Sequence, residues 1–307
     1  MKVTDLSTDR LDPTPVRLAQ GDAHLDLAPG FGGTILAWWS ERDGRRIDWL
    51  RPTTSTPSLA GDTACFPLVP FSNRVRDGRF SFRGRTVDLP RVERYGAHFR
   101  HGFGCLRRWD IVERDARSAV IAHREDGALW PFPYEARQAF ALSERDLSIR
   151  FSVTNTGRAA MPAGFGLHPY FPRTPRARIV AGVAGQWESD AEVMPVRLMT
   201  PPPAGQDPGR GIEPAATALD NVYTGWSRDA RIEWPDRGAR LTMTAEAPLD
   251  VLIVFTPPGK DFFCVEPVSN ITDAFNLAAA GRDDTGMIVL EPGATVAATV
   301  TLRAERL

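Results

Sequence analysis

Apolar and polar residues alternate in short runs along most of this chain, and this period of two limits its fold more than any other feature. Residues 138–142 and 147–153 alternate on either side of a polar turn at residues 143–146. Successive side chains of a β-strand point to opposite faces, so this alternation predicts strands with one buried face. Two such runs joined by a short turn predict a β-hairpin.

Further hairpins follow from the same rule. Residues 80–82 and 87–89 flank Arg83-Gly84-Arg85, and residues 232–234 and 241–243 flank a turn at 235–238. The run from Val251 to Phe255 is continuously apolar, which predicts a strand buried on both faces. Helical periodicity is scarce, and the 26 prolines and 26 glycines suit many short strands and tight turns. These patterns predict an all-β fold, a large antiparallel β-sandwich.

The domain organisation follows from length and from the lack of linkers. A chain of 307 residues could form two domains, but all-β sandwiches often exceed 200 residues as one unit. We find no repeat and no low-complexity segment, so residues 1–307 are predicted to form a single domain, with residues 1–20 as an N-terminal extension or first strand. One long irregular stretch rich in Pro and Gly, residues 194–218, leads to Leu219-Asp220-Asn221-Val222-Tyr223. Loops of that length are usually functional or mobile.

Composition excludes several classes of function. A formal net charge of −1 provides no long-range field for nucleic acid or an anionic membrane. Cys65, Cys105 and Cys264 are widely spaced, which argues against a disulfide scaffold and suits a reducing compartment. Residues 1–20 lack the apolar segment of a signal peptide, and no apolar run approaches the roughly 20 residues that span a bilayer. We expect a cytoplasmic protein without nucleic-acid or membrane partners.

Three distant segments each place a protonatable side chain among aromatic residues, glycine and proline. They contain His101 (Phe99-Arg100-His101-Gly102-Phe103-Gly104), His168 (Gly166-Leu167-His168-Pro169-Tyr170-Phe171) and Glu266 (Phe263-Cys264-Val265-Glu266-Pro267). A histidine titrates near neutral pH, and a carboxyl group on an apolar strand has its pKa raised by desolvation. Such groups can take a proton from one oxygen and deliver one to another. We therefore predict acid–base catalysis on a small polar ligand.

Each of these residues also fits a structural role. Glu266 could pair with an arginine, His168 could be a core histidine, and His101 could belong to a turn. Gly102 is expected to let a ligand approach the backbone closely. The other three histidines, His24, His98 and His123, lie in polar or surface-like contexts and receive no role.

Ligand-binding residues are expected in two further segments. Asn73 and Arg74 follow an apolar, proline-stiffened stretch, residues 66–72, where a forked guanidinium can hold ligand hydroxyls. Asp220 can accept hydroxyl hydrogen bonds, or can begin a turn. Of the tryptophans, Trp109, Trp226 and Trp234 could offer a face to a sugar ring, but in a sandwich tryptophan is more typical of the core.

Cofactor motifs do not occur in the chain. There is no Gly-x-Gly-x-x-Gly after a strand, no Walker motif, no Gly-x-Ser-x-Gly and no His-Glu-x-x-His. Two histidines and a glutamate also fit a 2-His-1-carboxylate iron site. The three candidates lie on separate segments without closely spaced ligand pairs, so we predict that no metal and no cofactor is required.

In their order, these segments resemble the aldose 1-epimerase (galactose mutarotase) family. The resemblance covers roughly residues 20–305, and it is carried by Phe71-Ser72-Asn73-Arg74, His101-Gly102, Leu167-His168-Pro169-Tyr170-Phe171, Leu219-Asp220-Asn221-Val222-Tyr223, Val265-Glu266-Pro267 and Leu290-Glu291-Pro292-Gly293. It implies a β-supersandwich and the interconversion of the α and β anomers of a free sugar without cofactor or metal.

The resemblance also implies a role for each residue. Glu266 would be the base that removes the proton of the C1 hydroxyl, and His168 the acid that protonates the ring oxygen. Glu266 would start ionised and His168 protonated. His101 would lie beside the ring oxygen or the C1 hydroxyl, while Arg74 and Asp220 would bind the remaining hydroxyls and Asn73 would support Arg74.

The chain departs from the galactose-catabolic members at both histidines. Those members resemble His-Gly-Gly and Asn-x-His-x-Tyr, where this chain has His101-Gly102-Phe103 and Leu167-His168-Pro169-Tyr170. The preferred sugar is therefore open. Arginines flank the motifs and could meet a phosphate, which keeps a hexose-6-phosphate mutarotase as an alternative; they are Arg76, Arg79, Arg100, Arg107 and Arg108. A non-catalytic sugar-binding module on the same fold is the other alternative.

Overall fold

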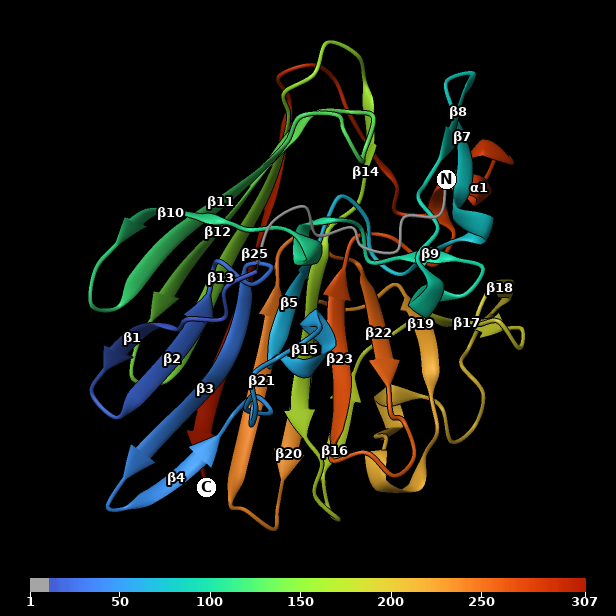
Figure 1. Cartoon of the computed structure of the whole chain (residues 1–307). Helices are drawn as coiled ribbons and strands as arrows, with labels where there is room; N and C mark the ends of the chain where they lie inside the picture. Colours follow the sequence, from blue (N-terminus) through green and yellow to red (C-terminus); the bar gives the residue numbers. More distant parts are fainter. Residues whose placement is uncertain (1–10) are drawn as a thin grey trace.

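The structure, a computed structural model, describes residues 11–307 and is built mainly from antiparallel strands (Figure 1). The larger sheet has the spatial order β1 (Val16–Gln20), β2 (Ala23–Ala28), β3 (Thr34–Arg42), β5 (Cys65–Leu68), β15 (Gly166–Pro172), β23 (Phe262–Val268), β22 (Val251–Phe255), β19 (Asp220–Thr224), β17 (Gly185–Ser189) and β18 (Pro195–Met199), with β4 (Arg45–Asp48) beside β3. The smaller sheet has the order β10 (Asp110–Arg114), β11 (Ser118–Glu125), β12 (Tyr134–Leu142), β13 (Asp146–Asn155), β25 (Thr295–Arg306), β21 (Ala239–Ala245), β20 (Asp229–Trp234) and β16 (Arg178–Ala181).

Short elements connect and extend the two sheets. Three two-stranded ladders are formed by β6 (Arg74–Val75) with β9 (Phe99–Arg100), β7 (Arg79–Phe82) with β8 (Arg85–Asp88), and β14 (Met161–Ala163) with β24 (Ile288–Leu290). The helical segments are α1 (Ala274–Ala279) and the 3₁₀ turns η1 (Ala60–Asp62), η2 (Arg76–Gly78), η3 (Glu93–Tyr95), η4 (Gly104–Leu106), η5 (Pro208–Arg210) and η6 (Pro214–Ala216). The predicted all-β, antiparallel class is confirmed.

The hairpins predicted from alternation are present. Strands β12 and β13, β7 and β8, and β20 and β21 pair antiparallel across the expected turns. The apolar run Val251–Phe255 forms β22, of which four residues are buried, as predicted for a strand covered on both faces.

One segment differs from its prediction. Residues 194–218 are not wholly irregular, because Pro195–Met199 forms β18, which pairs with β17. This strand lies at the edge of the larger sheet and none of its residues is fully buried. It therefore lacks the apolar alternation by which a strand is recognised in sequence.

The two sheets pack face to face through large side chains. Phe171 of β15 lies 6.4 Å, centroid to centroid, from Trp234 of β20, whose Nε1 donates to the Pro172 carbonyl oxygen at 2.8 Å. Phe171 also stacks on Phe263 of β23. Because strand side chains alternate, the neighbours His168 and Tyr170 point to the opposite face of the larger sheet.

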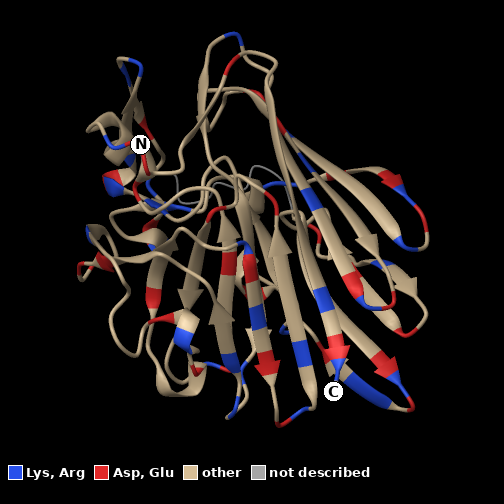
Figure 2. Cartoon of the chain, turned by 180° about the vertical axis from the view of Figure 1, so that it is seen from behind, with Lys and Arg blue, Asp and Glu red and all other residues tan. Residues whose placement is uncertain are grey.

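The strands of the smaller sheet carry charged residues of both signs (Figure 2). Cross-strand ion pairs there include Arg303 with Asp146 and Arg240 with Glu305. Within residues 11–307, no helix has the length and apolar character needed to cross a bilayer.

The start of the chain forms an edge strand of the larger sheet. Of the predicted extension or first strand at residues 1–20, residues 16–20 form β1, and residues 1–10 lie outside the described part. That the whole chain forms a single domain stays a prediction.

Candidate active site

Strand register brings His168 and Glu266 together. Gly166 of β15 pairs with Val268 of β23, and Tyr170 pairs with Cys264, which sets His168 directly opposite Glu266. Directly opposite residues of an antiparallel pair lie on the same face of the sheet. The pairing continues outward, because Phe66 of β5 is opposite His168 and Ile253 of β22 is opposite Glu266, and all four side chains line one cavity.

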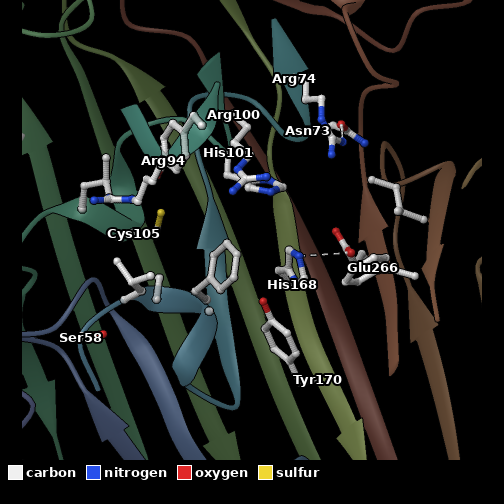
Figure 3. Close-up of a pocket in the computed structure, with 18 of the residues that line it drawn as sticks. Ser58, Asn73, Arg74, Arg94, Arg100, His101, Cys105, His168, Tyr170 and Glu266 are labelled. Atoms are coloured by element: carbon white, nitrogen blue, oxygen red, sulfur yellow. Dashed lines mark hydrogen bonds and ion pairs between the residues drawn. The ribbon is translucent and has the colours of Figure 1, made fainter. Parts of the chain in front are cut away.

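The His168 and Glu266 side chains are in contact in this cavity (Figure 3). His168 Nε2 lies 3.3 Å from Glu266 Oε1, and both side chains are less than a tenth exposed. The imidazole also stacks on the rings of Phe66 and Tyr170, with centroids 4.4 Å and 4.7 Å away, which holds its orientation. The second atoms, His168 Nδ1 and Glu266 Oε2, are buried without a hydrogen-bond partner from the described residues.

Burial favours the uncharged form of each partner. Burial, with a further contribution from Arg100 and Arg51, lowers the pKa of His168 to about 3. Burial, and secondarily the charge of Asp220, holds the pKa of Glu266 well above its usual range. Burial therefore opposes the ionised pair expected from the sequence, because moving both charges out of water is costly.

The two forms of the pair hold the same number of protons. A carboxylic acid beside a neutral imidazole carries one transferable proton, as does a carboxylate beside an imidazolium. Moving that proton across the 3.3 Å gap converts one form into the other without changing the net charge. The pair therefore has one group able to give a proton and one able to accept a proton.

His101 lies beside this pair. Its ring meets that of His168 edge to face, with centroids 5.3 Å apart, and its buried Nδ1 has no hydrogen-bond partner among residues 11–307. Burial, then the neighbouring His168 and two arginines, lowers the pKa of His101 well below its usual value, so the ring is neutral. A neutral imidazole can both donate and accept a hydrogen bond.

Gly102 does not serve the purpose expected from the sequence. It adopts φ +66°, and a Cβ there would lie 2.1 Å from the carbonyl oxygen of Val69. The prediction of a close approach by a ligand is therefore wrong. The segment that lies close to Gly102 is the β5–β6 connection. Its Val69 carbonyl oxygen accepts hydrogen bonds from the backbone N–H groups of Phe103 and Gly104.

Arg74, Asn73 and Asp220 form a second polar group in the cavity. Arg74 Nη1 donates to Asn73 Oδ1 at 3.1 Å, and Nη2 lies 3.4 Å from Asp220 Oδ2. The backbone carbonyl of Asn73 accepts from the His101 N–H at 2.8 Å, which ties this group to the His101 segment. All six residues selected from the sequence therefore line the same cavity.

The cavity has a volume of about 430 Å³, and part of its wall was not selected from the sequence. Phe66 and Tyr170 belong to segments that were recognised, but only as surroundings. Arg94 and Tyr95 were missed, because η3 carries no apolar pattern or motif that marks it as part of a site.

Comparison with known proteins identifies the family. A family model described as aldose 1-epimerase matches residues 16–303. The uncharacterised protein YphB of Escherichia coli K12 is 33% identical over 296 residues, which cover 94% of this chain and 98% of YphB. This chain belongs to the aldose 1-epimerase family.

Solved structures agree with this assignment to the aldose 1-epimerase family. A candidate aldose 1-epimerase of Escherichia coli K12 superposes with a TM-score of 0.86 at 32% identity, covering 96% of this chain and 99% of that protein. A galactose mutarotase-like protein of Clostridium acetobutylicum superposes with a TM-score of 0.84 at 19% identity, covering 95% of each chain, which supports the fold alone.

Most of the arginines considered for phosphate binding in this aldose 1-epimerase family member lie away from the cavity. Arg76 pairs with Asp273, and the exposed Arg79 pairs with Asp88. Arg107 is buried and Arg108 is exposed, and neither lines the cavity. Arg100 lines it.

The remaining aromatic and imidazole side chains are structural. The tryptophans are at most 3% exposed and belong to the core, which is the interpretation favoured from the sequence; they are Trp109, Trp226 and Trp234. His98 and His123 are buried and do not lie at the surface, but His98 does have a polar context, since its Nδ1 accepts from the Asp77 N–H. Neither lines the cavity.

Three buried groups lie close enough together to be considered as metal ligands. Ligand atoms of His168, Cys264 and Glu266 lie within 4.8 Å of one another. Metal binding requires the thiolate and the carboxylate. Burial raises the pKa of Cys264 and of Glu266 well above their usual ranges, so a metal ion would have to displace a proton from each of these two ligands.

Proposed function

We propose that this protein interconverts the α and β anomers of a free aldose by acid–base ring opening and closure. The observation that carries the proposal is the His168–Glu266 pair, which holds one transferable proton across 3.3 Å at the wall of a polar cavity. Membership of the aldose 1-epimerase family supports the same reaction.

The reaction needs one proton removed and one delivered at neighbouring oxygens. With the proton on His168, the Glu266 carboxylate takes the proton of the C1 hydroxyl while His168 protonates the ring oxygen. The C1–O5 bond breaks and C1 becomes the aldehyde carbon. After rotation about C1–C2, the ring oxygen attacks the other face of C1 and both proton transfers reverse.

Hydrogen bonding by the substrate favours the ionised form of the pair. A hydroxyl that donates to Glu266 stabilises its carboxylate, and a ring oxygen that accepts from His168 stabilises the imidazolium. Neutral His101 provides a further hydrogen-bonding atom, Nδ1, beside this point. One positioned acid or base typically contributes about 10²–10⁴-fold, so the pair suffices for a hemiacetal that already opens in water.

Recognition of the remaining hydroxyls is assigned to Arg74 and Asp220. The Arg74 guanidinium uses Nη1 on Asn73 and Nη2 on Asp220, which fixes its plane. A planar fork held in this way has further N–H groups for ligand oxygens. Asn73 is thus a positioning residue for Arg74.

The test is mutarotation of freshly dissolved α-glucose and α-galactose, followed by polarimetry. We expect Glu266→Gln and His168→Asn each to lower kcat by about 10²–10⁴-fold. Glu113→Gln, at an exposed position of β10, is the matched control and is expected to retain the full rate. Full rates in both cavity variants would contradict the assignment.

A non-catalytic sugar-binding module is the alternative outcome. It would show saturable binding of a sugar while NMR exchange spectroscopy detected no faster exchange of the anomers than in buffer. That result would remove the catalytic proposal and retain the cavity as a binding site.

A further inference from the structure

One wall of the cavity carries more positive charge than its carboxylates balance. Arg74 of β6 and Arg100 of β9 are directly opposite each other in register, and both line the cavity. Like charges opposite each other on a ladder are destabilising. Arg74 is compensated by Asp220, whereas Arg100 makes no ion pair with any residue from 11 to 307.

A third guanidinium adds to this imbalance. Arg94 lies over the Tyr95 ring at 5.0 Å from its centroid, and Arg100 lies over the same ring at 4.9 Å. Figure 3 shows Arg94 and Arg100 on the His101 side of the cavity. Arg94 likewise makes no ion pair within the described residues, and burial holds the pKa of Glu266 well above its usual range. Among residues 11–307, three guanidinium groups line the cavity against two carboxyl groups, those of Asp220 and Glu266.

The surroundings of Arg100 make this charge costly. The residue is half-buried, and burial together with Arg74 lowers the pKa of its guanidinium. A neutral sugar offers only hydroxyl oxygens to such a group. A carboxylate or phosphate offers charge-assisted, two-pronged hydrogen bonds that restore the balance.

We propose that the preferred substrate is an aldose that carries an anionic group, and that Arg94 and Arg100 bind this group. The inference rests on the proposed function of the same cavity, and it names the class of sugar. The anionic group points to the His101 side, away from Glu266, where Arg94 and Arg100 line the cavity of about 430 Å³. The charge can come from a hexuronate or a hexose 6-phosphate, and the experiment separates these two.

The experiment compares glucose, glucuronate and glucose 6-phosphate as substrates by NMR exchange spectroscopy. We expect kcat/KM to be at least about tenfold higher for one of the two anions than for glucose, as expected for hydrogen bonds to a charged group. Arg100→Gln and, separately, Arg94→Gln should lower the ratio of kcat/KM for that anion to that for glucose by about tenfold. The control Arg91→Gln alters an exposed residue of the same segment outside the cavity and should leave the ratio unchanged.

The outcomes separate the two proposals. Equal kcat/KM for glucose and both anions, with ratios unaffected in Arg100→Gln and Arg94→Gln, overturns the inference and leaves mutarotation intact. If no sugar is turned over, the proposed function fails, and calorimetric binding then decides the inference. Binding of glucuronate or glucose 6-phosphate that weakens about tenfold in Arg100→Gln supports it, and no binding of either overturns it.

Discussion

Replacing Glu266 with glutamine is expected to make stability depend on pH between 6.5 and 4.5 more steeply than in the wild type. In the folded wild type the His168–Glu266 pair holds one proton across this range. In the unfolded chain the ordinary pKa values are 6.5 for histidine and 4.5 for glutamate, so the unfolded pair also holds one proton, on His168. Stability depends on pH only where the two states bind different numbers of protons, so this pair contributes no slope.

The variant loses this balance. Folded Glu266→Gln protein binds no proton at His168 until the pH falls toward about 3, the folded pKa of this residue. The unfolded chain takes up a proton on His168 below pH 6.5. The unfolded state is therefore favoured by about 1.36 kcal/mol for each pH unit below 6.5, or by about 3 kcal/mol at pH 4.5.

Urea-induced unfolding at pH 6.5, 5.5 and 4.5 measures the effect. The relevant quantity is the difference in free energy of unfolding between Glu266→Gln and wild type, because other titrating groups cancel in it. The exposed control Glu113→Gln should show no such trend. If the Glu266→Gln difference stayed constant within about 0.5 kcal/mol, His168 would be protonated in the fold and the burial argument would be refuted.

Three further predictions concern the backbone, the metal and the ligand. Gly102→Ala should destabilise the fold by more than the roughly 1–2 kcal/mol of a left-handed alanine, because the new Cβ would meet Val69. The control Gly84→Ala, at φ +79° with open space around it, should cost only that amount. Thermal unfolding compares the two variants, and equal losses of stability would remove the steric argument. Dialysis against EDTA should leave the mutarotation rate unchanged, since the proposed proton transfers use only His168 and Glu266. A loss of rate that is restored by one divalent ion would contradict this. Arg74→Lys should raise KM about tenfold with little change in kcat, because a single ammonium group cannot make the two hydrogen bonds of the forked guanidinium. A fall in kcat alone would show instead that Arg74 acts on the transition state.

Local features of the fold could be predicted from the sequence because each hairpin is encoded within about 20 residues. The alternation of residues 138–153 specifies both strands and the turn between them, and β12 and β13 follow it. The exposed edge strand β18 could not be predicted in this way, because its pairing with β17 does not depend on an apolar face.

The candidate residues could be found in the sequence from their types and neighbours. Which of them contact one another in the fold could not. The alternation of apolar and polar residues does not specify that Gly166 pairs with Val268 rather than with a residue one position away. A shift of one residue would turn Glu266 into the core face and separate it from His168. The three arginines that line the cavity also come together only in the fold. The β6–β9 ladder places Arg74 opposite Arg100, and Arg94 lies in the η3 turn that precedes β9.

The amino-acid sequence by itself determined an antiparallel β-protein and marked six polar side chains as candidates for a site. Only the tertiary structure decided that these side chains share one cavity, that Gly102 makes room for backbone, and that burial opposes charge on His168 and Glu266. The physical reason is that periodicity and turn chemistry act between near neighbours in the chain. Register and desolvation depend instead on strands nearly a hundred residues apart, which come together only in the folded sheet.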